Sequence, residues 1–231
     1  MKELLRAWYY EERKKLAPMS WRARFRYIRQ YYWLYICGII GVIALIIFVI
    51  DRLLRGSPEY WIYAGFANTR ANVGNNSRIW KDFVEYAHYD PNEKEVEFNT
   101  ALFFDYTRNR ARGNTYYNSF IALADTGTMD LITMPVEQLS ALGESGRLMD
   151  WDLERCAPLR EKYGDRLVYY YPAEYMEETE PVPVGIDVSD SLLMKKYNFY
   201  VEADGCALGI IAESTRLDAV EVFIDFILSA E

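Results

Sequence analysis

Histidine and catalytic sequence motifs are nearly absent from this chain. His88 is the only histidine among 231 residues, and its position beside Asp90 near a predicted helix end favours an ordinary surface residue. A catalytic triad and a metal site built from several histidines are therefore excluded. GxSxG, HExxH, GxGxxG and a phosphate-binding glycine loop are missing as well. The sequence predicts a protein that is not an enzyme, with no catalytic residues, no bound metal and no cofactor.

Charged side chains are missing from the stretch between Arg29 and Asp51. Residues 31–50 are apolar or aromatic, and about 20 such residues in a helix cross a hydrocarbon core of about 30 Å. A buried core helix would carry a polar stripe, and a cleaved signal peptide would have a short basic region and an A-x-A site. Neither pattern is present. Residues 31–50 are therefore predicted to form a transmembrane helix that holds the chain in the lipid bilayer.

Negative charge is scarce before this stretch and abundant after it. Residues 1–55 hold eleven Lys/Arg and four Asp/Glu, a net charge of +7, and the rest of the chain holds 15 and 30, a net charge of −15. The positive-inside rule predicts a single-pass protein of the cell membrane with a cytoplasmic N-terminus and an extracytoplasmic C-terminal domain. The acidic charge of that domain argues against a nucleic-acid partner.

The expected organisation has four parts. They are a basic amphipathic cytoplasmic segment at 1–30, the transmembrane helix at 31–50, a juxtamembrane linker at 51–58 and an extracytoplasmic α/β domain at 59–231.

The basic segment is expected to form two short helices separated by Pro18, the second beginning near Ser20. Apolar residues recur along the second helix at spacings of four and three, with arginines opposite; they are Trp21, Phe25, Ile28, Tyr32 and Tyr35. This pattern predicts an amphipathic helix that lies on anionic lipid before the chain enters the membrane. The alternative is that these side chains only set the depth of the span.

Strand and helix patterns alternate along the C-terminal domain. Alternation of this kind predicts βαβ units and a mainly parallel sheet flanked by helices. The expected strands are 61–66, 96–104, 129–134, 166–171, 182–188 and 207–212, the fourth and fifth of them paired around a Glu-rich turn. The expected helices are 79–87, 117–124, 136–142 and 217–227.

The cysteines leave two alternatives open. Cys37 lies in the predicted span, so Cys156 and Cys206 are the only two in the exported domain. Export permits a disulfide between them, and closing a loop of about 50 residues contributes up to about 4 kcal/mol in the chain-entropy model. Two independent buried thiols are the favoured alternative, because sequence does not reveal pairing.

Three stretches carry a resemblance to a known family: 129–151, 183–190 and 207–229. The order of strands and helices in these stretches resembles that of extracellular solute-binding proteins of ABC transporters, which have the periplasmic-binding-protein type II fold. The chain as a whole resembles a reduced, membrane-anchored form of such a protein from Gram-positive bacteria. The resemblance implies an α/β domain similar to one lobe of that fold. Residues 151–182 are too few for a complete second lobe.

Six residues are candidates for ligand contact. Sheets of this kind bind ligands at loops beyond the carboxyl ends of their strands. An aromatic ring there stacks on a flat apolar face, and a carboxylate accepts hydroxyl hydrogens. The candidates are Asn68, Thr69, Thr133, Met134, Trp151 and Asp187. The alternative at Trp151 is core packing, and at Asp187 it is a turn.

The expected function is that of a membrane-tethered protein that binds a small polar solute, such as a sugar, or docks a transport partner such as an ABC permease. The alternative is an interaction or assembly module of the cell surface without a ligand pocket. A third hypothesis is a glycosyltransferase-like enzyme. Asp150 and Asp152 form a D-x-D pair, which in such enzymes holds a metal-bound nucleotide sugar. A cleft lined by Thr133, Trp151 and Asp187 favours solute binding, and a filled surface there favours the interaction module.

Overall fold

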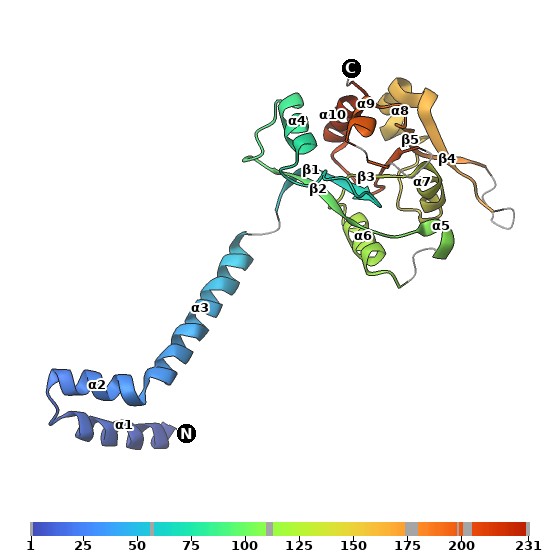
Figure 1. Ribbon diagram of the computed structural model, residues 1–231. Coiled ribbons are helices and arrows are strands. Elements are labelled where there is room, and N and C mark those ends of the chain that lie inside the picture. The colour runs from blue at the N-terminus through green and yellow to red at the C-terminus, as the bar shows by residue number, and fades with distance from the viewer. Residues whose placement is uncertain are drawn as a thin grey trace. The chain divides into compact units, whose positions relative to one another are not determined.

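The computed structural model describes residues 2–55, 58–109, 113–173, 180–197, 199–200 and 205–229 (Figure 1). The chain forms two compact units, an N-terminal unit at Met1–Ser57 and a C-terminal unit at Pro58–Glu231.

The described part of the N-terminal unit consists of three helices: α1 (Lys2–Leu16), α2 (Trp21–Tyr31) and α3 (Trp33–Arg55). The predicted break around Pro18 is confirmed, and the extended backbone of Ser20 precedes α2. Among the described residues, one helix is long and apolar enough to cross a membrane, at Trp33–Asp51. Every side chain from Trp33 to Ile50 is exposed, which separates this helix from the buried core helix of a soluble protein.

The apolar row predicted for residues 21–35 is broken in the structure. α2 ends at Tyr31, and Tyr32 lies in a turn with αR backbone angles before α3 begins. The ring of Tyr32 packs edge-on against Trp8 of α1, with ring centroids 6.0 Å apart. Tyr32 and Tyr35 therefore do not continue the row of α2, because periodicity along the sequence does not detect a single-residue break.

Within the described part of the C-terminal unit, six strands form one sheet in the order β2-β1-β3-β6-β5-β4. β1 pairs in parallel with β2 and β3, whereas the β3–β6, β6–β5 and β5–β4 pairs are antiparallel. The strands are β1 (Tyr60–Ala67), β2 (Glu95–Leu102), β3 (Leu131–Met134), β4 (Leu167–Tyr170), β5 (Val182–Asp187) and β6 (Ala207–Ile210).

The α/β class is confirmed, but the expectation of a mainly parallel sheet is wrong. Three of the five pairings among the described strands are antiparallel. The predicted pairing of the strands at 166–171 and 182–188 accounts for one of them, because β4 and β5 follow one another with no described helix between them, and a parallel pair needs a crossover connection. A strand that is buried on both faces is apolar throughout, whichever way it runs. The sequence of β6 therefore does not reveal its direction.

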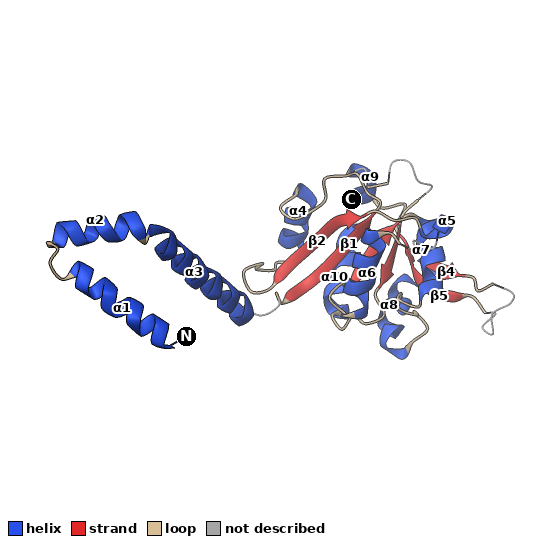
Figure 2. Cartoon of the chain, turned by 90° about the horizontal axis from the view of Figure 1, so that it is seen from below, coloured by secondary structure: helices blue, strands red, loops and turns tan. Residues whose placement is uncertain are grey.

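Helices cover both faces of the sheet (Figure 2). Alternate residues of β1 enter different cores: Ile62, Ala64 and Phe66 belong to one cluster, and Tyr63 and Ala67 to the other. The first face is covered by α4 (Arg78–Tyr86), α8 (Ala157–Tyr163), α9 (Leu192–Lys196) and α10 (Leu217–Leu228), and the second by α6 (Thr115–Asp125) and α7 (Val136–Leu142).

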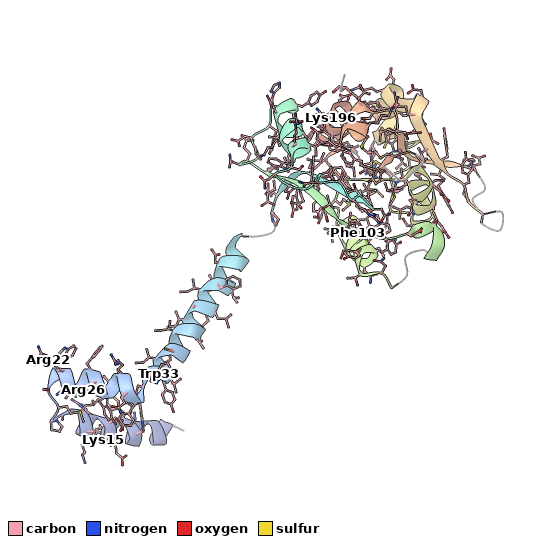
Figure 3. The ribbon with its side chains drawn as sticks, viewed as in Figure 1. Lys15, Arg22, Arg26, Trp33, Phe103 and Lys196 are labelled. Carbon is pink, nitrogen blue, oxygen red and sulfur yellow. The ribbon has the colours of Figure 1, made fainter. Side chains whose placement is uncertain are left out.

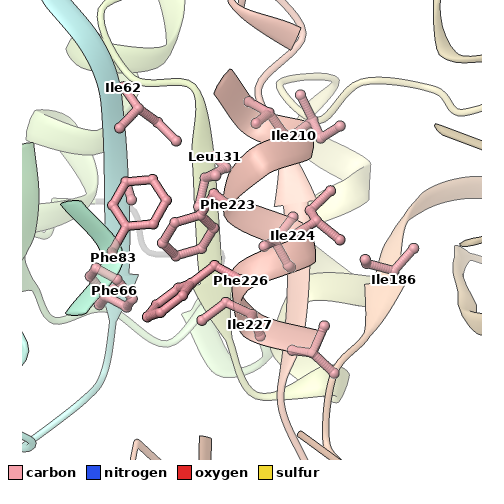
Figure 4. Packing of buried hydrophobic residues seen from close by; sticks show 14 of the residues in the cluster. Ile62, Phe66, Phe83, Leu131, Ile186, Ile210, Phe223, Ile224, Phe226 and Ile227 are labelled. Atoms are coloured by element: carbon pink, nitrogen blue, oxygen red, sulfur yellow. The ribbon is translucent and has the colours of Figure 1, made fainter. Parts of the chain in front are cut away.

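The core of the first face is centred on aromatic rings (Figure 4). Phe223 of α10 lies 5.2 Å from Phe83 and 5.7 Å from Phe98, measured between ring centroids. Rings at these separations gain about 0.5–1.5 kcal/mol per pair beyond the area that they bury. α10 therefore closes this face by inserting its aromatic side chains between α4 and the sheet.

The four predicted helices of the C-terminal unit are present within a few residues of their expected bounds. Side-chain oxygens stabilise two of the starts: Ser77 accepts from the N–H of Trp80, and Asn114 accepts from the N–H of Tyr116. The shorter helices were not predicted, because one turn or two gives too few residues for a period to show. They are α5 (Tyr106–Asn109), α8, α9 and the 3₁₀ turns η1 (Gly143–Ser145), η2 (Glu154–Cys156) and η3 (Gly164–Arg166).

Candidate functional site

The candidate site is the edge of the sheet at which β1, β2, β3 and β5 end, called the carboxyl edge here. The register places Ala67 beside Leu102, and both Met134 and Asp187 beside Ala207. After β1 the chain adds β2 on one side and then β3 on the other. The gap between the ends of β1 and β3 is thus a topological switch point, the usual ligand position in open α/β sheets.

Five of the six candidate residues lie at the carboxyl edge, and the sixth does not. Trp151 donates its backbone N–H to the carbonyl of Pro183, near the start of β5, so it lies at the opposite edge of the sheet. Its side chain is fully buried in the core of the first face. Trp151 and Asp187 therefore do not line a common cleft, and Trp151 packs the core. The five at the edge are Asn68, Thr69, Thr133, Met134 and Asp187.

Phe199 and Tyr200, which lie far along the same chain, cover the switch point. The hydroxyl of Thr69 donates to the carbonyl of Phe199 at 2.7 Å. The hydroxyl of Tyr200 donates to the carbonyl of Thr133 at 2.7 Å and lies 3.1 Å from the Thr133 hydroxyl. Thr69, Thr133 and Phe199 are all buried. Burial raises the pKa of the Tyr200 hydroxyl well above its ordinary value, so this group stays protonated as a donor.

The other candidates at the edge also have partners within the protein. Asn68 has a positive φ of 61°, and its side-chain amide exchanges two hydrogen bonds with the backbone of Phe104, at 2.7 and 3.0 Å. Met134 is fully buried in the core of the second face. The carboxylate of Asp187 accepts from the N–H and the hydroxyl of Ser189. Asn68 thus links the loop after β1 to the residues after β2, and Asp187 closes a turn after β5.

Both cysteines of the C-terminal unit are free and buried. The Cys156 thiol lies 3.1 Å from the sulfur of Met149, and the Cys206 thiol lies next to the carboxyl edge. Burial raises the pKa of both thiols, which keeps them protonated and unreactive.

The D-x-D pair is divided between two structural roles. The carboxylate of Asp150 accepts from the N–H of Asp152 at 2.8 Å, and Asp152 forms an ion pair with Arg160. Within the described ranges, no group of three or more His, Cys, Asp or Glu side chains is arranged to hold a metal ion.

An exposed aromatic pair at the carboxyl edge was not among the predicted residues. Phe103 follows β2 directly (Figure 3). Its ring packs edge-on against that of Tyr116 of α6, with ring centroids 5.7 Å apart. Their side chains are 44% and 46% exposed, unlike the buried rings of the core. The available signal was the apolar run at 101–104, in which Phe103 directly follows the last residue of β2.

A buried ion pair was also missed. Asp130, at the start of β3, is fully buried, and the Nε of Arg216 lies 2.9 Å from its carboxylate. The hydroxyl of Ser214 and the N–H of Tyr63 donate to the same carboxylate at 2.7 and 2.8 Å. The sequence signal for this buried pair was an aspartate within the apolar stretch at 129–134. Since every oxygen has a donor, this cluster reads as a structural link between β1, β3 and the start of α10.

Comparison with known proteins gives no relative from which to transfer a site. No family model, no curated protein and no solved structure matches this chain.

Proposed function

We propose that this protein is a membrane-tethered docking module, with α3 as a single transmembrane anchor and the C-terminal unit as an extracytoplasmic domain that binds a protein partner. The observation that carries the proposal is the filled carboxyl edge. Phe199 and Tyr200 occupy the switch point where a solute would bind, and Phe103 and Tyr116 are exposed at the same edge. Exposed aromatic rings are typical anchors of protein interfaces.

The proposed partner has a basic contact surface. Residues 56–231 carry a net charge of −15, and opposite charges on two proteins raise the rate at which they associate. The orientation of the anchor follows from the basic residues before α3 and the positive-inside rule.

The orientation is tested with an epitope tag after Glu231. We expect an antibody to reach the tag on intact cells or, in a cell with an outer wall, on protoplasts. A tag placed before Met1 is the control, and we expect it to be reached only after the membrane is permeabilised. The reverse pattern would remove the extracytoplasmic role.

Partner docking is tested by replacing Phe103 with the photoreactive residue benzoylphenylalanine in living cells. We expect irradiation to give one discrete crosslinked species, because this side chain is 44% exposed beside Tyr116. The matched control is the same substitution at Leu153, which is 43% exposed but follows Trp151 at the opposite edge. We expect no discrete species from the control.

Solute binding is the second candidate, and the strand order β2-β1-β3 favours it. A solute at the switch point would have to displace Tyr200 from Thr133. Equal or absent crosslinking at positions 103 and 153, together with a small polar solute that raises the unfolding midpoint of the full chain, would support this second candidate over docking.

A further inference from the structure

The two helices before the membrane helix form a braced pair. Arg24 of α2 donates to the carbonyls of Leu16 and Ala17, at 2.8 and 3.0 Å, and so caps the end of α1. Glu12 of α1 accepts from Lys15 at 2.8 Å and from the hydroxyl of Tyr27 at 3.1 Å. The side of α2 that carries Arg24 and Tyr27 therefore faces α1.

The remaining surface of α2 has two parallel rows of exposed side chains. Trp21, Phe25 and Ile28 form an apolar row and are 80%, 64% and 37% exposed. Spacings of four and three keep each row on one stripe of the helix, and an offset of one residue makes the rows adjacent. The basic row consists of Arg22, Arg26 and Arg29, all exposed.

The helix carries no negative charge, and its basic row faces away from α1. α2 contains four arginines and no acidic residue. Figure 3 shows Arg22 and Lys15 on opposite sides of the helix pair. An adjacent apolar and basic row is the pattern of a helix that lies in the interface of an anionic bilayer.

The connection to α3 sets the depth of α2. Only Tyr32 separates the end of α2 at Tyr31 from the start of α3 at Trp33. A membrane helix that begins at Trp33 holds the preceding residues at the level of the lipid headgroups. The apolar row of α2, which ends at Ile28, therefore lies close along the chain to the side chains that enter the hydrocarbon core.

The cleft between α1 and α2 is less suited to an anionic lipid headgroup than the outer surface of α2. It measures about 510 Å³ and is lined by Trp8, Arg13, Arg24 and Tyr32, among others. Glu12 also lines it, and the ion pair with Lys15 lowers the pKa of Glu12, so the carboxylate stays charged. A charged carboxylate in the cleft repels a lipid phosphate. The outer rows of α2 present no such repulsion, because α2 contains no acidic residue.

We propose that the outer surface of α2 docks onto an anionic bilayer, with Trp21, Phe25 and Ile28 inserted among the upper acyl chains and Arg22, Arg26 and Arg29 bound to lipid phosphates. This inference rests on the proposed membrane anchor and is independent of the docking partner of the C-terminal unit. An acidic protein is the less favoured occupant, because a single residue joins α2 to the span and holds it at the membrane surface.

The test uses the full chain in nanodiscs of phosphatidylcholine, with or without phosphatidylglycerol as about one quarter of the lipid. The acyl chains are brominated near the headgroup, and the Trp21 signal is the difference between the wild-type chain and Trp21→Phe. We expect lipid bromine to quench Trp21 in the anionic discs. Replacing Arg22, Arg26 and Arg29 by glutamine is expected to lower this quenching about two-fold or more, because these arginines supply the attraction of α2 to anionic lipid.

The matched control removes the same charge from α1 by replacing Arg6, Arg13 and Lys14 with glutamine. We expect it to leave Trp21 quenching unchanged. Unquenched Trp21 in anionic discs would overturn the proposal and favour a protein occupant, and equal loss in both triple variants would overturn the assignment to α2. The variant Trp33→Phe gives the Trp33 signal by difference and separates failure of α2 docking from failure of the membrane anchor. If Trp33 is also unquenched, the proposed membrane anchor is wrong.

Discussion

Replacing Arg216 by leucine is expected to destabilise the C-terminal unit by about 3–5 kcal/mol, the range for removing one partner of a buried ion pair. Asp130 is fully buried, and Arg216 supplies its only salt bridge among the described residues. The guanidinium also donates to the carbonyls of Gly127 and Thr128, at 3.2 and 2.7 Å. The substitution leaves a buried charge without its counter-ion and two carbonyls without a donor.

The loss is expected to depend on pH in a defined direction. Burial raises the pKa of Asp130, and Ser214, Tyr63 and Arg216 oppose that rise. Without Arg216 the pKa of Asp130 rises further. A carboxyl whose pKa is higher in the folded state binds its proton more tightly there, so the free energy of unfolding increases as pH falls through that pKa. The difference between the variant and the wild type should therefore shrink as pH falls from neutrality.

The measurement is a urea titration of the full chain in mild detergent, read by pulse proteolysis of the C-terminal unit. Arg147→Leu is the matched control, because Arg147 pairs with Asp125 at 2.8 Å, where the aspartate side chain is 51% exposed. An exposed pair contributes about 0–1 kcal/mol. A loss at Arg216 no larger than at Arg147, at neutral pH, would show that the buried pair does not hold β3 and α10 together.

Replacing Phe223 by alanine is expected to cost about 3–5 kcal/mol, the usual range for a large aromatic residue in a core. Phe223 is fully buried, and its ring contacts those of Phe66, Phe83 and Phe98. The cavity would lie between the sheet and the helix that covers it, so neither element can close the gap without losing its other contacts.

The same urea titration measures this loss. Phe103→Ala is the control, because it removes the same ring from a side chain that is 44% exposed; we expect about 1 kcal/mol or less. Similar losses at the two positions would mean that α10 does not close the core as described.

The position of residues at the carboxyl edge was predictable, because strand ends can be read from sequence. The apolar runs at 61–66 and 129–134 end next to Thr69 and Thr133, and their parallel pairing through β1 and β3 brings the ends together. The return of Phe199 and Tyr200 to that edge was not predictable. It joins residues separated by 130 positions, as in the Thr69–Phe199 hydrogen bond.

Trp151 was misplaced for a related reason. Its sequence position after an apolar run suggested a strand end near the ligand position, but the direction of β6 decides which edge it reaches. β6 is antiparallel to both β3 and β5, so Leu148, which bridges to Ile211 beyond the end of β6, lies at the edge opposite to Met134.

Features that depend on local composition could be derived from the amino-acid sequence alone. These are an apolar helix long enough to span a membrane, the charge difference between the two parts of the chain, and the long amphipathic helices and buried strands of an α/β domain. Period and length establish such features without knowledge of distant residues. Three other features are visible only in the tertiary structure. They are the direction of β6, the contact of Tyr200 with the switch point, and the burial of Asp130 against Arg216. Each of these depends on contacts between residues far apart in the chain, which a local pattern does not encode.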